Sequence, residues 1–226
     1  MTEREKILGR IREALRIAAP LPGHGHALQP NPAPPSHLAR KWLPLVGGTF
    51  EDRLALFQKN ASDLKAEFHL LDTSDGLVKA MQDLRDGHHW KKIATHRGVL
   101  TESVAQSINL PVCWTDQGYD VKELEGCDVG ITGCDALIAQ TGSILLTNRS
   151  AGGRALSVLP PHHVVLAKRE QFVADLPEAF TILKKRYAPD YPSIITLITG
   201  PSRTGDIERI LVLGAHGPKK LTILCI

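Results

Sequence analysis

Two glycine- and hydroxyl-rich segments hold most of the residues that could bind a small ligand. The first is Gly130–Ser143, with the sequence GITGCDALIAQTGS. Gly133 and Gly142 allow a backbone to approach a ligand closely and to adopt positive φ angles. Thr141 and its neighbouring hydroxyls could donate hydrogen bonds from the same edge. Two tight turns around a β-hairpin explain the pattern equally well, so both interpretations stay open.

The second segment is Gly200–Pro218, with the sequence GPSRTGDIERILVLGAHGP. Backbone amides at a helix start, together with Ser202, Arg203 and Thr204, would form a cradle for a carboxylate or phosphate. Thr204 or Asp206 would cap the helical turn that follows. Asp206 could instead pair with Arg203 and hold it in a structural salt bridge.

His216 lies between two glycines near the end of the second segment. Its ordinary pKa near neutrality makes it the candidate catalytic residue, as a group that takes and returns a proton. A histidine that only packs or caps is the alternative.

No metal site and no intrinsic cofactor is expected from the sequence. The spacing of the cysteines fits neither a zinc site nor an iron–sulfur site. All four lie mostly in apolar, strand-like runs, namely Cys113, Cys127, Cys134 and Cys225. Known nucleotide-binding and hydrolase motifs are also absent.

The elements that must position these segments alternate between strand-like and helix-like runs. The expected strands are Glu67–Leu71, Lys92–Thr95, Val112–Thr115, Asp128–Thr132, Val164–Ala167, Ile194–Thr199 and Leu221–Ile226. The expected helices are Glu51–Leu64, Asp75–Arg85, Leu100–Ser107, Val121–Glu125 and Asp175–Arg186. This alternation predicts an α/β fold with a mostly parallel sheet and helices on both faces. Ligands of such sheets usually bind beyond the carboxyl ends of the strands.

Three further features complete the expected organisation. Leu137–Ala139 and Ile144–Thr147 break the alternation and predict a hairpin. The two strands that flank the second segment are expected to be buried. An amphipathic helix over Thr2–Ala18, opened by a capping box, is followed by a linker over Leu21–Ser36 that is rich in Pro, Gly and His. We therefore expect an N-terminal helical arm and linker at 1–37 and an α/β domain at 38–226.

Composition excludes several classes of protein. The 226 residues carry a formal net charge of +3 and 42% hydrophobic residues, which is ordinary for a globular chain and argues against a nucleic-acid partner. No stretch approaches the roughly 18 apolar residues of a membrane helix. There is no secretory signal, and cysteines are few, so a reduced cytoplasmic protein is expected.

The two segments together, GITGCDALIAQTGSILL followed by GPSRTGDIERILVLGAHGP, closely resemble the LUD domain of the lactate-utilisation protein C family. The likeness covers roughly Leu38–Ile226. It implies a fold like that of the sugar-phosphate isomerase and CoA-transferase group. It also implies membership of a bacterial system that oxidises L-lactate to pyruvate with two iron–sulfur proteins. Because this chain has no cysteine cluster, iron–sulfur clusters are expected only in those partner proteins.

Two positions depart from the family pattern. Relatives commonly have Glu where this chain has Gln140, and a neutral amide cannot act as an acyl acceptor or general base. Cys134 stands where relatives usually have Ser or Ala. Both differences argue against independent CoA-transferase chemistry.

The leading hypothesis is a subunit of the L-lactate oxidation system that binds lactate, pyruvate or a similar small anion. The expected ligand-binding residues are Gly133, Cys134, Asp135, Gln140, Thr141, Gly142, Ser202, Arg203, Thr204 and Asp206. This hypothesis requires the two segments to meet around one hollow. A stand-alone enzyme of the same fold group and a non-catalytic scaffold that docks iron–sulfur proteins are the alternatives. The true ligand, the oligomeric state, the electron acceptor and catalysis by this subunit alone stay open.

Overall fold

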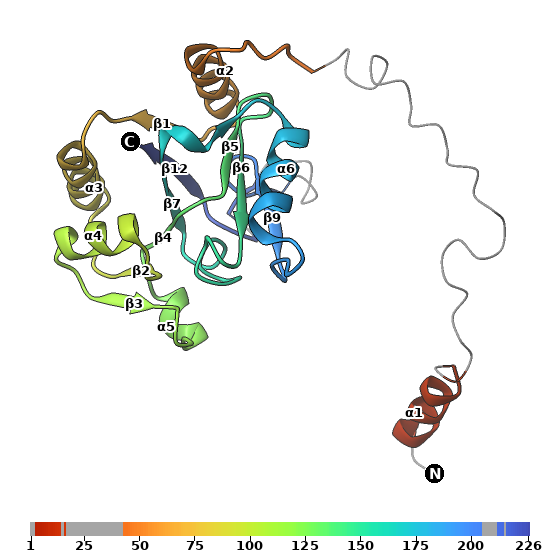
Figure 1. Cartoon of the computed structure of the whole chain (residues 1–226). Helices are drawn as coiled ribbons and strands as arrows, with labels where there is room; N and C mark the ends of the chain where they lie inside the picture. Colours follow the sequence, from red (N-terminus) through yellow and green to blue (C-terminus); the bar gives the residue numbers. More distant parts are fainter. Residues whose placement is uncertain (1–2, 15, 17–42, 205–211, 215) are drawn as a thin grey trace. The chain divides into compact units, whose positions relative to one another are not determined.

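The computed structural model describes residues 3–14, 16, 43–204, 212–214 and 216–226 (Figure 1). Its contacts divide the chain into two units, Met1–Leu43 and Pro44–Ile226. The first unit contains helix α1, Glu3–Ala14, which carries exposed Ile7 and Leu8. The expected linker lies outside the described residues.

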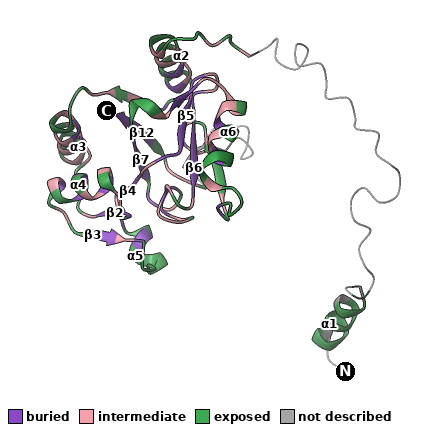
Figure 2. Cartoon of the chain, viewed as in Figure 1, coloured by how far each residue is buried: buried purple, intermediate pink, exposed green. Residues whose placement is uncertain are grey.

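A six-stranded sheet forms the centre of the second unit, and all its neighbouring strands are parallel. Its order is β1 (Glu67–Leu70), β12 (Lys220–Cys225), β7 (His162–Ala167), β4 (Val129–Thr132), β2 (Ile93–Thr95) and β3 (Val112–Trp114). Every residue of β4 and β7 is buried, as is typical of parallel strands covered on both faces (Figure 2). The prediction of an α/β fold with a mostly parallel sheet is therefore confirmed.

Helices α3 (Ser74–His88) and α4 (Val99–Ile108) cover one face of this sheet. Their buried residues Leu77, Met81 and Val104 belong to one apolar cluster with Ile131 of β4 and Val164 of β7. These apolar residues recur at helical spacing, so each helix buries one side and leaves the other to water.

The opposite face is covered by helix α2 (Phe50–Asp63) and by a second sheet, which the sequence did not predict as a separate layer. The order of this mixed sheet is β8 (Phe172–Val173), β5 (Ala136–Ile138), β6 (Ser143–Thr147) and β9 (Ile195–Ile198). Strands β5 and β6 pair antiparallel, which confirms the expected hairpin. A core cluster joins Phe57 of α2 and Leu137 of β5 to Val165 of β7.

Short elements complete the second unit. Helix α6 (Leu176–Tyr187) packs on the outer face of the mixed sheet through Ala179 and Leu183. Helix α5 (Val121–Glu125) buries Leu124 beside β2 and β3. The remaining short elements are η1 (Arg169–Gln171), β10 (Arg203–Thr204) and β11 (Val212–Leu213), the last two paired antiparallel.

The strands and helices predicted on described residues of this unit all occur, with ends within three residues of those expected. The helical turn expected after Thr204 or Asp206 lies outside the described residues. The environment of one strand differs. The expected strand Ile194–Thr199 is β9, an edge strand of the mixed sheet, where Ile195 and Leu197 are each 42% exposed. It is therefore not one of two buried strands of the parallel sheet. No helix in the described part of the chain is both long and apolar enough to cross a membrane.

Candidate functional site

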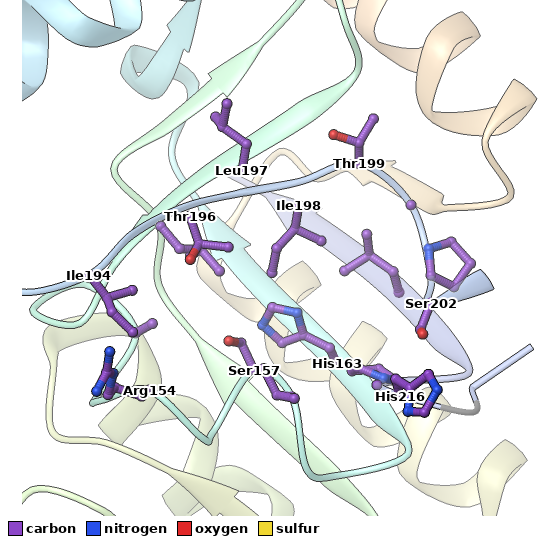
Figure 3. A pocket seen from close by; sticks show the side chains of 18 of the residues that line it. Arg154, Ser157, His163, Ile194, Thr196, Leu197, Ile198, Thr199, Ser202 and His216 are labelled. Carbon is purple, nitrogen blue, oxygen red and sulfur yellow. The ribbon is translucent and has the colours of Figure 1, made fainter. Parts of the chain in front are cut away.

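A cavity of about 370 Å³ lies between the two sheets (Figure 3). One wall comes from β6 and β9 of the mixed sheet, and another comes from β7 and β12 of the parallel sheet. Three loop segments, 153–158, 199–202 and 216–218, contribute most of the remaining residues of its lining, and Ala151 and Ile194 complete it. Most of the lining is apolar, with a few polar side chains, as is common in small-molecule sites.

The cavity lies at the amino ends of the parallel strands. His163 and Leu221, which line it, are the second residues of β7 and β12. The expectation of a site beyond the carboxyl ends does not describe this cavity. The reason is the second sheet, because the chain leaves β9 and runs back over the start of β12, where Ser202 N donates to the Pro218 carbonyl at 2.9 Å.

His163 is a buried polar residue of the cavity wall, only 1% exposed. Its Nε2 lies 2.9 Å from the hydroxyl of Thr132, which is itself buried. Its Nδ1 is buried without a hydrogen-bond partner in the described structure. Burial, and to a smaller extent the neighbouring His162, lowers the pKa of His163 to about 3, so the ring is neutral near pH 7.

Arg154 lines the same cavity and is exposed. It makes no ion pair with any residue that the structure describes. Gly152 and Gly153 precede it with φ angles of 62° and 114°, which favour glycine. A Cβ at Gly152 would lie 2.2 Å from the Cβ of His96, so the close packing of this turn positions the arginine. The sequence analysis did not select Arg154, whose only distinguishing feature in the sequence is its position directly after two glycines.

Ser202 and His216, both predicted from the second segment, line this cavity together. The amide of Gly214 donates to the Ser202 carbonyl at 3.0 Å and closes the segment on itself. A Cβ at Gly217 would lie 3.2 Å from the Ser202 Cβ, so the backbone at Gly217 packs closely against Ser202. Buried Ser157 adds a further hydroxyl from the loop before β7.

The other residues predicted from the second segment do not line the cavity. The guanidinium of Arg203 donates to the carbonyl of Leu64, just after the end of α2. This contact satisfies a carbonyl at a helix end, where a cation is favourable. Thr204 belongs to β10, and its side chain is not described. Asp206 lies outside the described residues.

The turn of the first segment faces helix α2. Asn60 Nδ2 donates to the carbonyls of Ala139 and Gln140 at 2.9 and 3.0 Å. The side chain of Gln140 donates to the Pro44 carbonyl at 3.0 Å. Gly142 adopts a φ of 63° against Asn60, and the hydroxyl of Thr141 is buried without a partner.

The first segment contacts the residue that precedes the second one, since the hydroxyls of Ser143 and Thr199 lie 2.8 Å apart. Thr199 lines the cavity, but Gln140, Thr141 and Gly142 do not. The expected single hollow, with Arg203 on one wall and Thr141 on the other, is thus replaced by a cavity that only the second segment borders.

Gly133 and Cys134 line a different hollow of about 380 Å³ at the carboxyl ends of β2 and β4. Asp135, the next residue, is 1% exposed and accepts hydrogen bonds from Arg186 and Tyr187, each at 2.6 Å. Burial raises the pKa of the Cys134 thiol far above its ordinary value, so the thiol is protonated near pH 7. Asp135 therefore has a structural ion pair, and the predicted residues are distributed over separate places.

Metal-binding groups do not gather within the described residues. No group of three or more His, Cys, Asp or Glu side chains there is placed to hold a metal ion. All four cysteines are free and buried.

The family model and two of the more similar relatives match about half of the chain, and the matched family model includes the part that forms the cavity. Residues 116–226 match the family model of the LUD domain. Lactate utilization protein C of Anoxybacillus flavithermus is 36% identical over 107 residues, which are 47% of each chain. The protein of that name from Deinococcus radiodurans is 32% identical over 127 residues, 52% of this chain and 59% of the relative. The chain thus matches about half the length of these relatives.

A longer but more distant match is lactate utilization protein C of Bacillus velezensis, which is 25% identical over 80% of each chain. Among solved structures, the crystal structure of a DUF162 family protein from Deinococcus radiodurans matches with a TM-score of 0.62 and 22% identity. That match covers 80% of this chain and 99% of the other and shows a shared fold.

Proposed function

We propose that this chain, a member of the lactate utilization protein C family with its LUD domain at residues 116–226, binds a small carboxylate in the cavity between its two sheets. The names of its relatives suggest the process that it serves, which is lactate utilisation, and we propose L-lactate as the form used. Lactate and pyruvate are the ligands of first choice.

The observation that carries this proposal is Arg154, a cation on the cavity wall with no ion-pair partner in the described part of the chain. A guanidinium presents a fork of N–H donors that matches the two oxygens of a carboxylate. The hydroxyls of Ser157 and Ser202 line the same space and could supply further hydrogen bonds. The volume is within the range of small-molecule sites, roughly 300–1,000 Å³.

The proposal includes partner proteins, in the cytoplasm, that carry the iron–sulfur clusters for oxidation of lactate to pyruvate. The four thiols of the chain support the proposal of clusters in partner proteins, because all four are buried in the apolar clusters of the fold and so serve its packing. Purification of the chain from bacteria grown on L-lactate should recover iron–sulfur proteins with it. Recovery of the chain alone under gentle conditions would contradict this part.

The carboxylate site is tested by calorimetric titration of L-lactate and pyruvate into wild type and Arg154→Gln. A charge-assisted hydrogen bond contributes about 1.5–3 kcal/mol, so the substitution should weaken binding about 10- to 100-fold. Arg10→Gln is the matched control, because Arg10 is an exposed arginine of α1 and its loss removes the same charge. Equal affinities for wild type and Arg154→Gln would contradict the proposal.

A further inference from the structure

The pair formed by His163 and Thr132 can present either a donor or an acceptor to the cavity. His163 lies on the wall, whereas Thr132 is behind it and does not line the cavity. The only hydrogen bond of the imidazole joins its Nε2 to the Thr132 hydroxyl at 2.9 Å, and its Nδ1 has no partner in the described structure. In Figure 3 the ring lies between Ser157 and Ile198.

A neutral imidazole carries one proton, on either Nε2 or Nδ1. With the proton on Nε2, the ring donates to Thr132 and leaves a lone pair on Nδ1. With the proton on Nδ1, Nε2 accepts from the Thr132 hydroxyl and Nδ1 becomes a donor. Because a hydroxyl can rotate to donate or accept, Thr132 satisfies Nε2 in both cases.

We infer that His163, positioned by Thr132, recognises the oxygen on the second carbon of the ligand, so that one cavity accepts both a 2-hydroxy acid and the corresponding 2-oxo acid. This inference rests on the proposed function, in which Arg154 binds the carboxylate. The hydroxyl of a 2-hydroxy acid donates to the lone pair of Nδ1. The keto oxygen of a 2-oxo acid accepts the proton of Nδ1. Either ligand gives the buried nitrogen a partner, and an unpaired buried polar atom is costly.

A group that only accepts would favour one ligand over the other. A carboxylate at the same place would accept from the hydroxy acid but could not pair with the keto oxygen of the oxo acid. The imidazole avoids this selection because its proton can move between the two nitrogens while its charge does not change. We therefore expect the affinities for L-lactate and pyruvate to lie within about 10-fold of each other, since the site makes one hydrogen bond of the same kind to each.

The experiment compares L-lactate, pyruvate and propionate, which keeps the carboxylate but has no oxygen on its second carbon. Binding is measured by calorimetry for wild type, His163→Gln, His163→Asn and Thr132→Val. The Gln variant keeps a polar group near the Nε2 position, and the Asn variant keeps one near the Nδ1 position. We expect His163→Gln and Thr132→Val to weaken lactate and pyruvate binding about 10-fold and to leave propionate binding unchanged. His163→Asn should retain more of the affinity for lactate and pyruvate than His163→Gln does.

A spectroscopic readout on the wild-type protein covers the case in which a core variant does not fold. In ¹⁵N-histidine spectra, the His163 proton should be on Nε2 in the lactate complex and on Nδ1 in the pyruvate complex. The same protonated nitrogen in both complexes would overturn the inference. So would an equal loss of propionate affinity in His163→Gln, because the ring would then only support the fold.

The two proposals fail in different ways. If Arg154→Gln leaves all three affinities unchanged while the His163 variants show the expected pattern, the carboxylate contact is wrong and the inference about His163 stands. If wild type binds none of the three acids, both proposals are overturned.

Discussion

Acidification from pH 7 to pH 5 should destabilise this protein because two adjacent histidines are buried in uncharged form. His162 and His163 are the first residues of β7, and they are 3% and 1% exposed. Burial lowers the pKa of each from 6.5 to about 3, with smaller contributions from His88 and Lys220 at His162 and from His162 at His163. In the unfolded chain both rings regain their ordinary pKa and take up protons below it.

The sign and size of the effect follow from this difference. Between pH 6.5 and pH 3 the unfolded state binds more protons, so the free energy of unfolding rises with pH in that range. The contribution is fully present above the unfolded pKa and is lost as the pH falls. At pH 5 each histidine should cost about 2 kcal/mol relative to pH 7, or about 4 kcal/mol for the pair. Such a loss is a large fraction of the stability of an ordinary domain.

The assay is urea unfolding at pH 7, 6 and 5, with circular dichroism as the readout. His163→Gln and His162→Gln provide the internal comparison, since each removes one titrating ring and should remove about half of the loss that this pair contributes. The comparison uses slopes against pH, so a lower starting stability of a variant does not affect it. A wild-type stability that stays level from pH 7 to pH 5 would refute the reasoning. An unchanged slope in both variants would assign the effect to other groups.

Two other substitutions test how the segments are held. Gly142→Ala should lower the free energy of unfolding by about 1–2 kcal/mol, because the φ of Gly142 is 63° and a Cβ would lie 2.9 Å from the Ala61 nitrogen. As the control, Gly87→Ala in helix α3 has no atom within 4 Å of its Cβ position and should raise the free energy of unfolding by about 0.5–1 kcal/mol. Equal effects of the two substitutions in urea unfolding would contradict this account. Asp135→Ala should cost about 1–3 kcal/mol in the same assay, because it removes the acceptor of Arg186 and Tyr187, although Arg186 is 46% exposed and can be hydrated. A loss below about 1 kcal/mol would show that this ion pair contributes little.

The order and type of the elements could be predicted from the sequence because they depend on local patterns. Alternating β-branched runs and amphipathic runs set the strands and helices, and the GITGCDALIAQTGS segment predicted its own hairpin. Ser202 and His216 were expected to share a site, and both line the cavity. These two residues meet whenever the chain folds back on itself after β9, so no knowledge of the sheet order was required.

The contacts between layers could not be predicted, because they depend on which strands join which sheet. The pattern of Ile194–Thr199 fits an inner strand as well as the edge strand β9. Arg203 was expected to hold an anion, but a carbonyl at the end of α2 lies within its reach. Arg154 was overlooked because it follows two loop glycines, where neither periodicity nor a motif marks a residue. Its significance comes only from the cavity that the second sheet closes.

The position of three strands in the parallel sheet has a consequence for the matched half of the chain. Strands β4, β7 and β12 come from residues 116–226, and they occupy the middle of the sheet. Their outer neighbours, β1 on one side and β2 on the other, come from the preceding half. A fragment that starts at residue 116 would therefore leave unpaired backbone amides and carbonyls at Thr222–Cys225 of β12 and Val129–Ile131 of β4, where β1 and β2 pair with them. Exposed strand edges of this kind pair with other chains, so residues 116–226 depend on the preceding half of the chain to avoid aggregation.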